Sequence, residues 1–175
     1  MQHSLQPVRF YNRTYHENMR KKRIMVIGPR GSGKTSLVNF LNEYDGPLRR
    51  TQDTIYGRNT IDVPSAYIEN AWMYKHMIAL SQDAWCMLLI LDQSRCAEVY
   101  SPGFAKAFRV PVIGIINKID LSPENEEICI RQMKAIGVAE PYFRISVSDG
   151  KGMEELKTYL LELKERYGGY YEIHN

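Results

Sequence analysis

The chain has few cysteines, and their arrangement favours neither a disulfide nor a metal site. Cys86, Cys96 and Cys129 are the three cysteines in 175 residues, and no two of them are closely spaced. An odd number of cysteines without a signal-peptide pattern indicates a reducing compartment, and the wide spacing argues against structural zinc. We therefore expect a cytoplasmic protein with reduced thiols.

Long apolar runs are also absent. The longest apolar run extends from Ala84 to Leu91. Its length is far below the ~18 residues that a membrane-spanning helix needs. A short run of this kind is typical of a strand that is buried on both faces of a sheet. We expect no membrane partner.

Charge of one sign is not in large excess. The chain has 23 basic and 20 acidic residues, and its formal net charge of +3 is too small to indicate a nucleic-acid partner. The length suits one domain, and no internal repeat or low-complexity segment is visible. We expect a flexible or partner-binding leader at 1–22, a folded domain at 23–168 and a short tail at 169–175.

Predicted strands and helices alternate along the chain. We predict strands over 23–27, 84–91, 112–116 and 142–147, and a hairpin from strands around 51–56 and 60–62. Helices are expected after the glycine-rich segment at 28–35, over 67–80 with an apolar face that includes Trp72, from Pro102, over 123–136 and up to Gly168. Ser122 is the expected cap of the 123–136 helix, and Gly137 its end. Such alternation predicts an α/β fold with a mostly parallel sheet, helices on both faces and a ligand at the carboxyl ends of the strands.

The segment GPRGSGKT, from Gly28 to Thr35, matches the phosphate-binding pattern G-x-x-x-x-G-K-[ST] between a predicted strand and a predicted helix. Its glycines let successive N–H groups face the phosphates, and the helix N-terminus adds positive potential. Lys34 is expected to reach the outer phosphates and Thr35 to bind magnesium. The predicted contacts are Gly28, Pro29, Arg30, Gly31, Ser32, Gly33, Lys34, Thr35 and Ser36. The alternative is a glycine-rich turn with an incidental lysine.

The segment NKID, Asn117 to Asp120, follows a buried strand and so falls beside the expected ligand. The Asp120 carboxylate can accept hydrogen bonds from guanine N1–H and N2–H₂, which adenine does not offer. Lys118 can lie along the base, and Asn117 can tie this loop to the phosphate loop. The predicted base contacts also include Leu121, Ser146 and Val147. The alternatives are a surface turn with a capping aspartate and a simple strand-end turn at Ser146.

These segments resemble the small GTPase superfamily, and more closely the EutP/PduV family of P-loop GTPase-like proteins from bacterial microcompartments for ethanolamine and propanediol use. The resemblance lies in KRIMVIGPRGSGKTSL, RRTQDTIYG, NTIDVPSAYIEN, SPGFAKAF and VPVIGIINKIDL, which together span most of residues 21–160. It implies the three-layer P-loop NTPase sandwich of the small GTPases.

The resemblance also implies a site and a function. It places Asp62 beside magnesium, Thr51 in the switch I region, and Asn117, Lys118 and Asp120 on guanine. Whether Thr51 or Thr54 closes over the terminal phosphate stays open, since either can be an ordinary strand threonine. The implied cofactors are GTP or GDP with Mg²⁺, and the implied function is that of a slow or regulated GTPase, accessory to a microcompartment. Residues 1–22 are either a helix that binds a shell or core protein or a frayed leader.

The chain departs from the family pattern Asp-Thr-Pro-Gly-Glu, because residues 62–66 read Asp-Val-Pro-Ser-Ala. Ser65 lacks the backbone freedom of glycine but keeps an N–H and adds a hydroxyl, so it stays a candidate catalytic residue. Ala66 cannot orient an attacking water through its side chain. Arg30 is either an arginine finger supplied in cis or, as we prefer, a solvated side chain. We therefore expect nucleotide binding with slow hydrolysis.

Two other functions stay open. One is a phosphotransferase, such as the acetate kinase activity attributed within this family, which would use the P-loop to hold a phosphoryl donor, ATP included. The other is an interaction module whose nucleotide fold is retained without a nucleotide. The sequence shows no pocket for an acyl substrate, so the phosphotransferase ranks below the GTPase.

Overall fold

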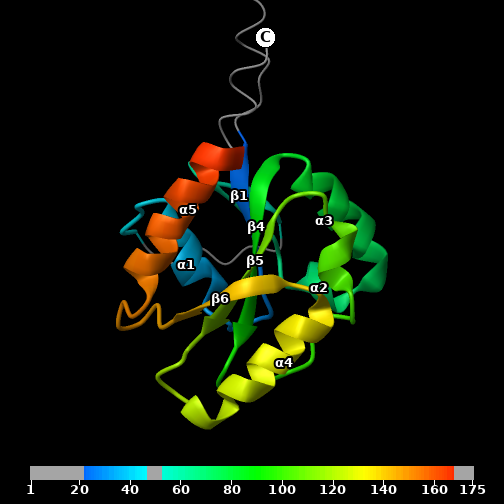
Figure 1. Cartoon of the computed structure of the whole chain (residues 1–175). Helices are drawn as coiled ribbons and strands as arrows, with labels where there is room; N and C mark the ends of the chain where they lie inside the picture. Colours follow the sequence, from blue (N-terminus) through cyan, green and yellow to red (C-terminus); the bar gives the residue numbers. More distant parts are fainter. Residues whose placement is uncertain (1–21, 47–52, 168–175) are drawn as a thin grey trace, which may run out of the picture.

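A six-stranded β-sheet forms the middle layer of the protein (Figure 1). The computed structural model describes residues 22–46 and 53–167. The strands are β1 (Arg23–Ile27), β2 (Ile55–Tyr56), β3 (Thr60–Asp62), β4 (Ala84–Asp92), β5 (Val112–Asn117) and β6 (Ala139–Ile145). They lie in the order β2-β3-β1-β4-β5-β6, and only the β2–β3 pair is antiparallel. The mostly parallel sheet and the β2–β3 hairpin are as predicted.

Helices cover both faces of this sheet (Figure 1). α1 (Lys34–Leu41) and α5 (Met153–Tyr167) pack on one face, and α2 (Ala66–Glu69), α3 (Tyr74–Ser81) and α4 (Glu126–Ile136) pack on the other. The short 3₁₀ helices η1 (Ala71–Met73), η2 (Phe104–Ala107) and η3 (Pro123–Asn125) lie in the connections. This confirms the three-layer α/β sandwich.

Strand β4 is the centre of the core because its side chains alternate between the two faces. All of its residues are buried. Met87, Leu89 and Leu91 belong to the apolar cluster under α3 and α4. Cys86, Leu88 and Ile90 belong to the cluster under α1 and α5. Each large apolar side chain contributes roughly 1.5–3 kcal/mol through burial, which explains why this strand is apolar from Ala84 to Leu91.

The segment predicted as one helix over 67–80 is broken in the structure. Asn70 is extended, with φ −118° and ψ 105°, and separates α2 from η1 and α3. Its Nδ2 donates to the carbonyl of Ala66 at 2.9 Å, a local side-chain bond that competes with helix continuation. Because of this break Trp72 is 68% exposed, whereas Met77 is fully buried. The predicted apolar face was therefore wrong at Trp72.

Other differences are confined to the ends of elements. The 123–136 segment starts as η3, and Ser122 makes no side-chain capping bond, contrary to the prediction. Gly137, with φ 87°, ends α4 as expected. β6 begins at Ala139, earlier than predicted, because pairing with Ile113 extends this edge strand through exposed residues that carry no apolar pattern. The helix that was predicted to start at Pro102 begins only at Phe104.

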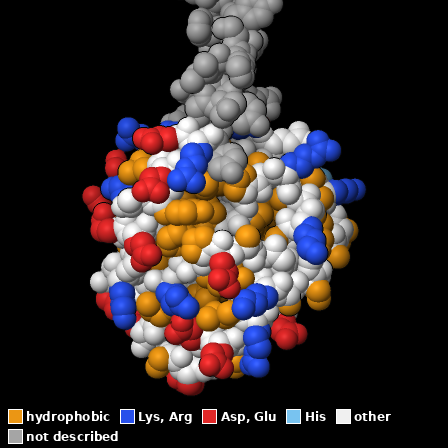
Figure 2. Space-filling view, in the orientation of Figure 1, with side chains coloured by type: hydrophobic (Ala, Val, Ile, Leu, Met, Phe, Trp, Pro, Cys, Tyr) orange, Lys and Arg blue, Asp and Glu red, His pale blue; other side chains and the backbone are white. Residues whose placement is uncertain are grey.

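Acidic and basic side chains are interspersed over the face of the protein shown in Figure 2. Neither sign forms a large continuous patch there, in line with the small net charge. Among residues 22–46 and 53–167, no helix combines the length and the apolar character that a bilayer crossing requires. Thr51, most of the 1–22 leader and the 169–175 tail lie outside the described residues.

Candidate functional site

The site residues predicted from the sequence that lie within the described ranges gather at one edge of the sheet, where parallel strands end. The register places Asp62 beside Val26 of β1 and Asn117 beside Asp92 of β4. Ile145, the last residue of β6, is paired with Asn117. The phosphate loop after β1 and the NKID loop after β5 therefore start from neighbouring positions, as expected for ligand sites in open α/β sheets.

The phosphate loop depends on two glycines with positive φ. Gly31 has φ 80° and Gly33 has φ 86°, a region that is costly for residues with a Cβ atom. Gly33 occupies the N-cap position of α1, where no side chain makes a capping bond. The N–H groups of the first turn of α1 have no intrahelical acceptor, so they are available to an anion.

Asn117 joins the NKID loop to the phosphate loop and to the loop after β6. Its Nδ2 donates to the carbonyl of Ser32 at 2.7 Å, and its Oδ1 accepts from the N–H of Val147 at 3.3 Å. A Cβ atom on Gly33 would collide with this same Nδ2. Asn117 is 2% exposed, so the three loops are held together by one buried amide.

A cavity of about 340 Å³ lies between these loops. Its lining residues are Gly33, Ser36, Asn117, Lys118, Asp120, Leu121, Val147 and Ser148. The cavity thus borders the end of the phosphate loop and both predicted base-contacting loops. Ligand cavities in proteins have volumes of this order, from about 300 to 1,000 Å³.

Ser146 is the predicted base contact that the structure does not place on this cavity. Ser146 is buried, its N–H donates to the carbonyl of Lys151 at 3.0 Å, and its hydroxyl lies 2.9 Å from that of Ser148. The bridge to Lys151 closes a turn that directs Ser146 inward. The next two residues, Val147 and Ser148, line the cavity instead.

Lys118 is held by an acidic residue that the sequence analysis did not single out. Its Nζ lies 2.7 Å from Oδ2 of Asp92, whose side chain is 5% exposed. The other Asp92 oxygen, Oδ1, accepts from the N–H of Ser94 at 3.0 Å and from its hydroxyl at 2.5 Å. Asp92 is the last residue of β4. Ligand sites in open α/β sheets lie at the carboxyl ends of strands, so this position in the sequence could have identified Asp92 as a candidate site residue.

Lys34 and Asp62 form an ion pair with side chains only 11% and 9% exposed. The pair connects the first residue of α1 to the last residue of β3. Mg²⁺ prefers oxygen ligands and is usually held by one or two protein groups together with phosphates and waters. The carboxylate of Asp62 and the hydroxyl of Thr35 fit that requirement. No cluster of three or more His, Cys, Asp or Glu side chains suited to a metal occurs in the described ranges.

The residues that depart from the family pattern lie on one short segment. Ser65 has φ −59° and ψ −29°, so its backbone is helical and no positive φ is used there. Its carbonyl accepts from the N–H of Ile68 at 3.0 Å and starts α2. Ala66 and Arg30 are exposed, Arg30 within the phosphate loop.

Arg95 is a second residue beside the phosphate loop that the sequence analysis missed. A Cβ atom built on Gly31 would lie 3.4 Å from Nη1 of Arg95. Arg95 follows the end of β4 by three residues. Because ligands bind near the carboxyl ends of strands in such sheets, this position could have identified Arg95 as a candidate site residue, as for Asp92.

Two of the three thiols lie close together. The Sγ atoms of Cys96 and Cys129 lie 3.9 Å apart, and all three cysteines are free. Burial and, secondarily, the neighbouring Cys96 raise the pKa of Cys129 to about 12. Its thiol is therefore neutral at physiological pH.

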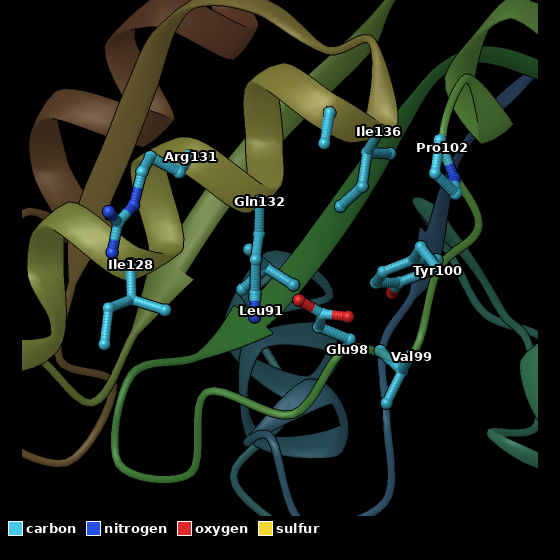
Figure 3. Close-up of a pocket in the computed structure, with 10 residues that line it drawn as sticks. Leu91, Glu98, Val99, Tyr100, Pro102, Ile128, Arg131, Gln132 and Ile136 are labelled. Carbon is cyan, nitrogen blue, oxygen red and sulfur yellow. The ribbon is translucent and has the colours of Figure 1, made fainter.

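A second cavity, of about 360 Å³, lies between α4 and the segment that follows β4 (Figure 3). Glu98 and Gln132 border it from opposite sides, whereas the side chain of Arg131 extends away from Glu98. The remaining lining residues are mostly apolar and include Leu91, Val99 and Tyr100. This cavity does not include any residue of the phosphate or NKID loops.

Comparison with known proteins places this site in a family. The sequence pattern of the family described as ethanolamine utilisation and propanediol utilisation, PduV-EutP, matches residues 21–162. The chain is 31% identical over 139 residues to the propanediol utilization protein PduV of Citrobacter freundii, covering 79% of this chain and 93% of that protein. It is 28% identical over 148 residues to the "Probable acetate kinase EutP" of Salmonella typhimurium, covering 83% and 92% respectively.

Solved structures support the fold independently. The crystal structure of a probable GTP-binding protein engB superposes with a TM-score of 0.62 at 19% sequence identity. It covers 82% of this chain and 99% of that one. At this identity the likeness concerns the fold alone, which is that of a P-loop GTPase. From the matched residues and the shared fold together, the chain belongs to the PduV-EutP family of P-loop proteins.

Proposed function

We propose that this protein binds a guanine nucleotide with Mg²⁺ and hydrolyses GTP slowly without a partner. The observation that carries the proposal is the bond from Asn117 to Ser32, which joins a phosphate-binding loop to a loop suited to guanine. The cavity between the two loops is bordered by groups for both ends of such a ligand.

The phosphate chain is proposed to bind along Gly28 to Ser36. The positive φ of Gly31 and Gly33 shapes the loop so that its N–H groups and the start of α1 can surround an anion. Lys34 is proposed to exchange its contact with Asp62 for the outer phosphates. Asp62 and Thr35 would then hold the magnesium ion, which supplies charge neutralisation at the phosphates.

The base is proposed to bind beside Asp120, which lines the cavity and is exposed. Its carboxylate accepts the two N–H groups on the edge of guanine. A site built to make such bonds can reject an analogue that lacks them by roughly 10⁴-fold or more. Lys118, fixed by Asp92, is proposed to lie along the base plane.

Hydrolysis is proposed to be slow because the segment after Asp62 lacks a side chain that can orient water. In GTPases, positioning of water and neutralisation of charge supply most of the rate. Ala66 has no polar group, and Ser65 offers only a hydroxyl and its backbone. A partner protein is the expected source of the missing group.

Calorimetric titration with GDP, GTP, ADP and ATP, with and without Mg²⁺, tests the binding proposal. We expect guanine preference, dependence on Mg²⁺ and loss of binding in Lys34→Ala. Asp120→Ala should reduce the preference for guanine over adenine, whereas Asp149→Ala, an exposed aspartate, is the matched control. Unchanged binding in Lys34→Ala contradicts the site assignment, and rapid single-turnover hydrolysis by the protein alone contradicts slow turnover.

A second candidate is phosphoryl transfer to acetate, since a relative at 28% identity carries the name of a probable acetate kinase. Product analysis with and without acetate separates the two functions. Release of inorganic phosphate that is independent of acetate supports the GTPase. Formation of acetyl phosphate supports the kinase, and absence of nucleotide binding supports an interaction module.

We further propose that the protein acts as an accessory of a microcompartment for ethanolamine or propanediol use. The family description supports the metabolic link. A shell or core protein is the proposed partner, and residues 1–22 are the proposed contact. Fusion of residues 1–22 to a fluorescent protein tests the contact, because diffuse fluorescence in cells that form shells would count against it.

A further inference from the structure

The guanidinium of Arg95 lies beside the phosphate loop at Gly31. From the Cβ position built on Gly31, Nη1 of Arg95 is 3.4 Å away, and both Cζ and Nη2 are 3.7 Å away. Nearly equal distances to three guanidinium atoms mean that its plane faces this Cβ position. The guanidinium therefore lies beside the loop at Gly31, at ordinary van der Waals distance from the point where a side chain would begin.

A structured turn holds Arg95 in this place. The N–H of Arg95 donates to the carbonyl of Asp92 at 3.2 Å. The Asp92 carboxylate closes the same turn through the N–H and the hydroxyl of Ser94 and also binds Lys118. The turn is therefore anchored to the NKID loop, and the position of Arg95 depends on the same residue that holds Lys118.

The charge of Arg95 is not neutralised by an acidic side chain within residues 22–46 and 53–167. Lys34 and Lys118 are paired with Asp62 and Asp92. Arg95 is exposed, and its guanidinium lies beside Gly31 of the phosphate loop. An unpaired guanidinium next to an anion-binding loop raises the local positive potential, and its five N–H donors suit phosphate oxygens.

We propose that Arg95 acts as an arginine finger supplied in cis, which contacts the phosphate chain across Gly31 and stabilises the transition state of hydrolysis. This inference rests on the proposed function. In the reaction, the water oxygen bonds to the γ-phosphorus while the bond from that phosphorus to the β–γ bridging oxygen breaks. The bridging oxygen keeps the electron pair, the water loses a proton, and GDP, inorganic phosphate and a proton are formed.

Arg95 is suited to this step because negative charge grows on the bridging oxygen and the β-phosphate as the bond breaks. Lys34 is the first residue of α1, and Arg95 lies beside Gly31. Arg30, the finger considered from the sequence, belongs to the loop itself, and within residues 22–46 and 53–167 its side chain makes no hydrogen bond or ion pair that orients it. The assignment therefore moves from Arg30 to Arg95.

Two variants test the proposal: Arg95→Ala and Arg95→Lys. Arg109→Ala is the matched control, because Arg109 is also exposed but precedes β5 and so lies at the opposite edge of the sheet. Two quantities are measured for each protein. They are the single-turnover rate at saturating GTP and Mg²⁺, and the affinity for GDP with and without aluminium fluoride, a mimic of the transferred phosphoryl group.

We expect Arg95→Ala to lower the single-turnover rate about 10²-fold, the usual effect of losing one preorganised transition-state donor. GDP affinity should change by less than about fivefold, the range of an exposed charge contact. The gain in affinity from aluminium fluoride should be lost in Arg95→Ala, partly kept in Arg95→Lys, and unchanged in Arg109→Ala.

Equal loss of affinity for GDP and for its aluminium fluoride complex would overturn the proposal, because Arg95 would then contribute to binding alone. A rate that is unchanged in Arg95→Ala, or wild-type protein that binds GDP without responding to aluminium fluoride, would also overturn it. Failure of the wild-type protein to bind GDP at all would instead overturn the proposed function, so the two failures are distinguishable.

Discussion

Asn117 donates a hydrogen bond of 2.7 Å to the backbone carbonyl of Ser32, although 85 positions separate the two residues in the chain. The bond makes the shape of the phosphate loop depend on the loop proposed to bind the base. Since Asn117 also accepts from Val147, one amide fixes three loops relative to one another. A change at this residue should therefore affect the fold and the proposed ligand site together.

Asn117→Ala should destabilise the protein and weaken nucleotide binding. The substitution leaves the carbonyl of Ser32 and the N–H of Val147 without their partner, at a cost of about 1–3 kcal/mol for a buried polar group. Urea unfolding measures the change. The control is Asn70→Ala, which removes an exposed bond to Ala66 and should change the free energy of unfolding by less than about 0.5 kcal/mol. Equal effects of the two substitutions would contradict this view of Asn117.

Gly33→Ala should cost more stability than Gly150→Ala, although both glycines have similar positive φ, 86° and 79°. Both alanines incur the strain of the left-handed region, roughly 1–2 kcal/mol. A Cβ atom at Gly33 also collides with Asn117, whereas nothing lies within 4 Å of one at Gly150. Overpacking of this kind adds about 1–3 kcal/mol.

Thermal unfolding of the two glycine variants, with nucleotide titration in parallel, measures this difference. Nucleotide binding should be lost in Gly33→Ala and retained in Gly150→Ala. Similar melting temperatures for the two variants would show that the contact with Asn117 has no energetic role.

Met77→Ala should destabilise the protein far more than Trp72→Ala, despite the larger side chain of Trp72. Met77 is fully buried and Trp72 is 68% exposed. Truncation of a buried methionine costs about 2–5 kcal/mol, and an exposed substitution away from special features changes stability by about 0.5 kcal/mol or less. Denaturant unfolding of both variants checks the prediction. A larger loss of unfolding free energy in Trp72→Ala than in Met77→Ala would mean that α2, η1 and α3 form one continuous amphipathic helix.

Cys96 should react with iodoacetamide before Cys86 and Cys129. Burial raises the pKa of both Cys86 and Cys129, the latter to about 12. At pH 8 a thiol of that pKa is ionised in roughly one molecule in 10⁴, and the thiolate is the reactive form. Cys96 is partly exposed. Mass spectrometry of timed samples identifies the order, Cys96→Ser is the control, and simultaneous labelling of the native protein would contradict the described burial.

Much of the fold could be predicted from local patterns. The apolar run at 84–91 predicted a strand buried on both faces, and β4 alternates its side chains between two apolar clusters. Glycine-rich and NKID segments after strands predicted the edge at which their loops meet. The continuous helix over 67–80 was not correctly predicted, because one extended residue, Asn70, interrupts it without changing the apolar composition.

What the sequence by itself determined is the order of elements and the chemistry available at strand ends, since both depend on residue types at short spacing. The tertiary structure alone decided which distant residues meet. Asp92 with Lys118, Arg95 with Gly31, and Cys96 with Cys129 are each brought together by neighbouring strands and by the helix that follows them. No local pattern encodes these contacts, because they arise from the order of strands in the sheet and from the path of the loops beyond it.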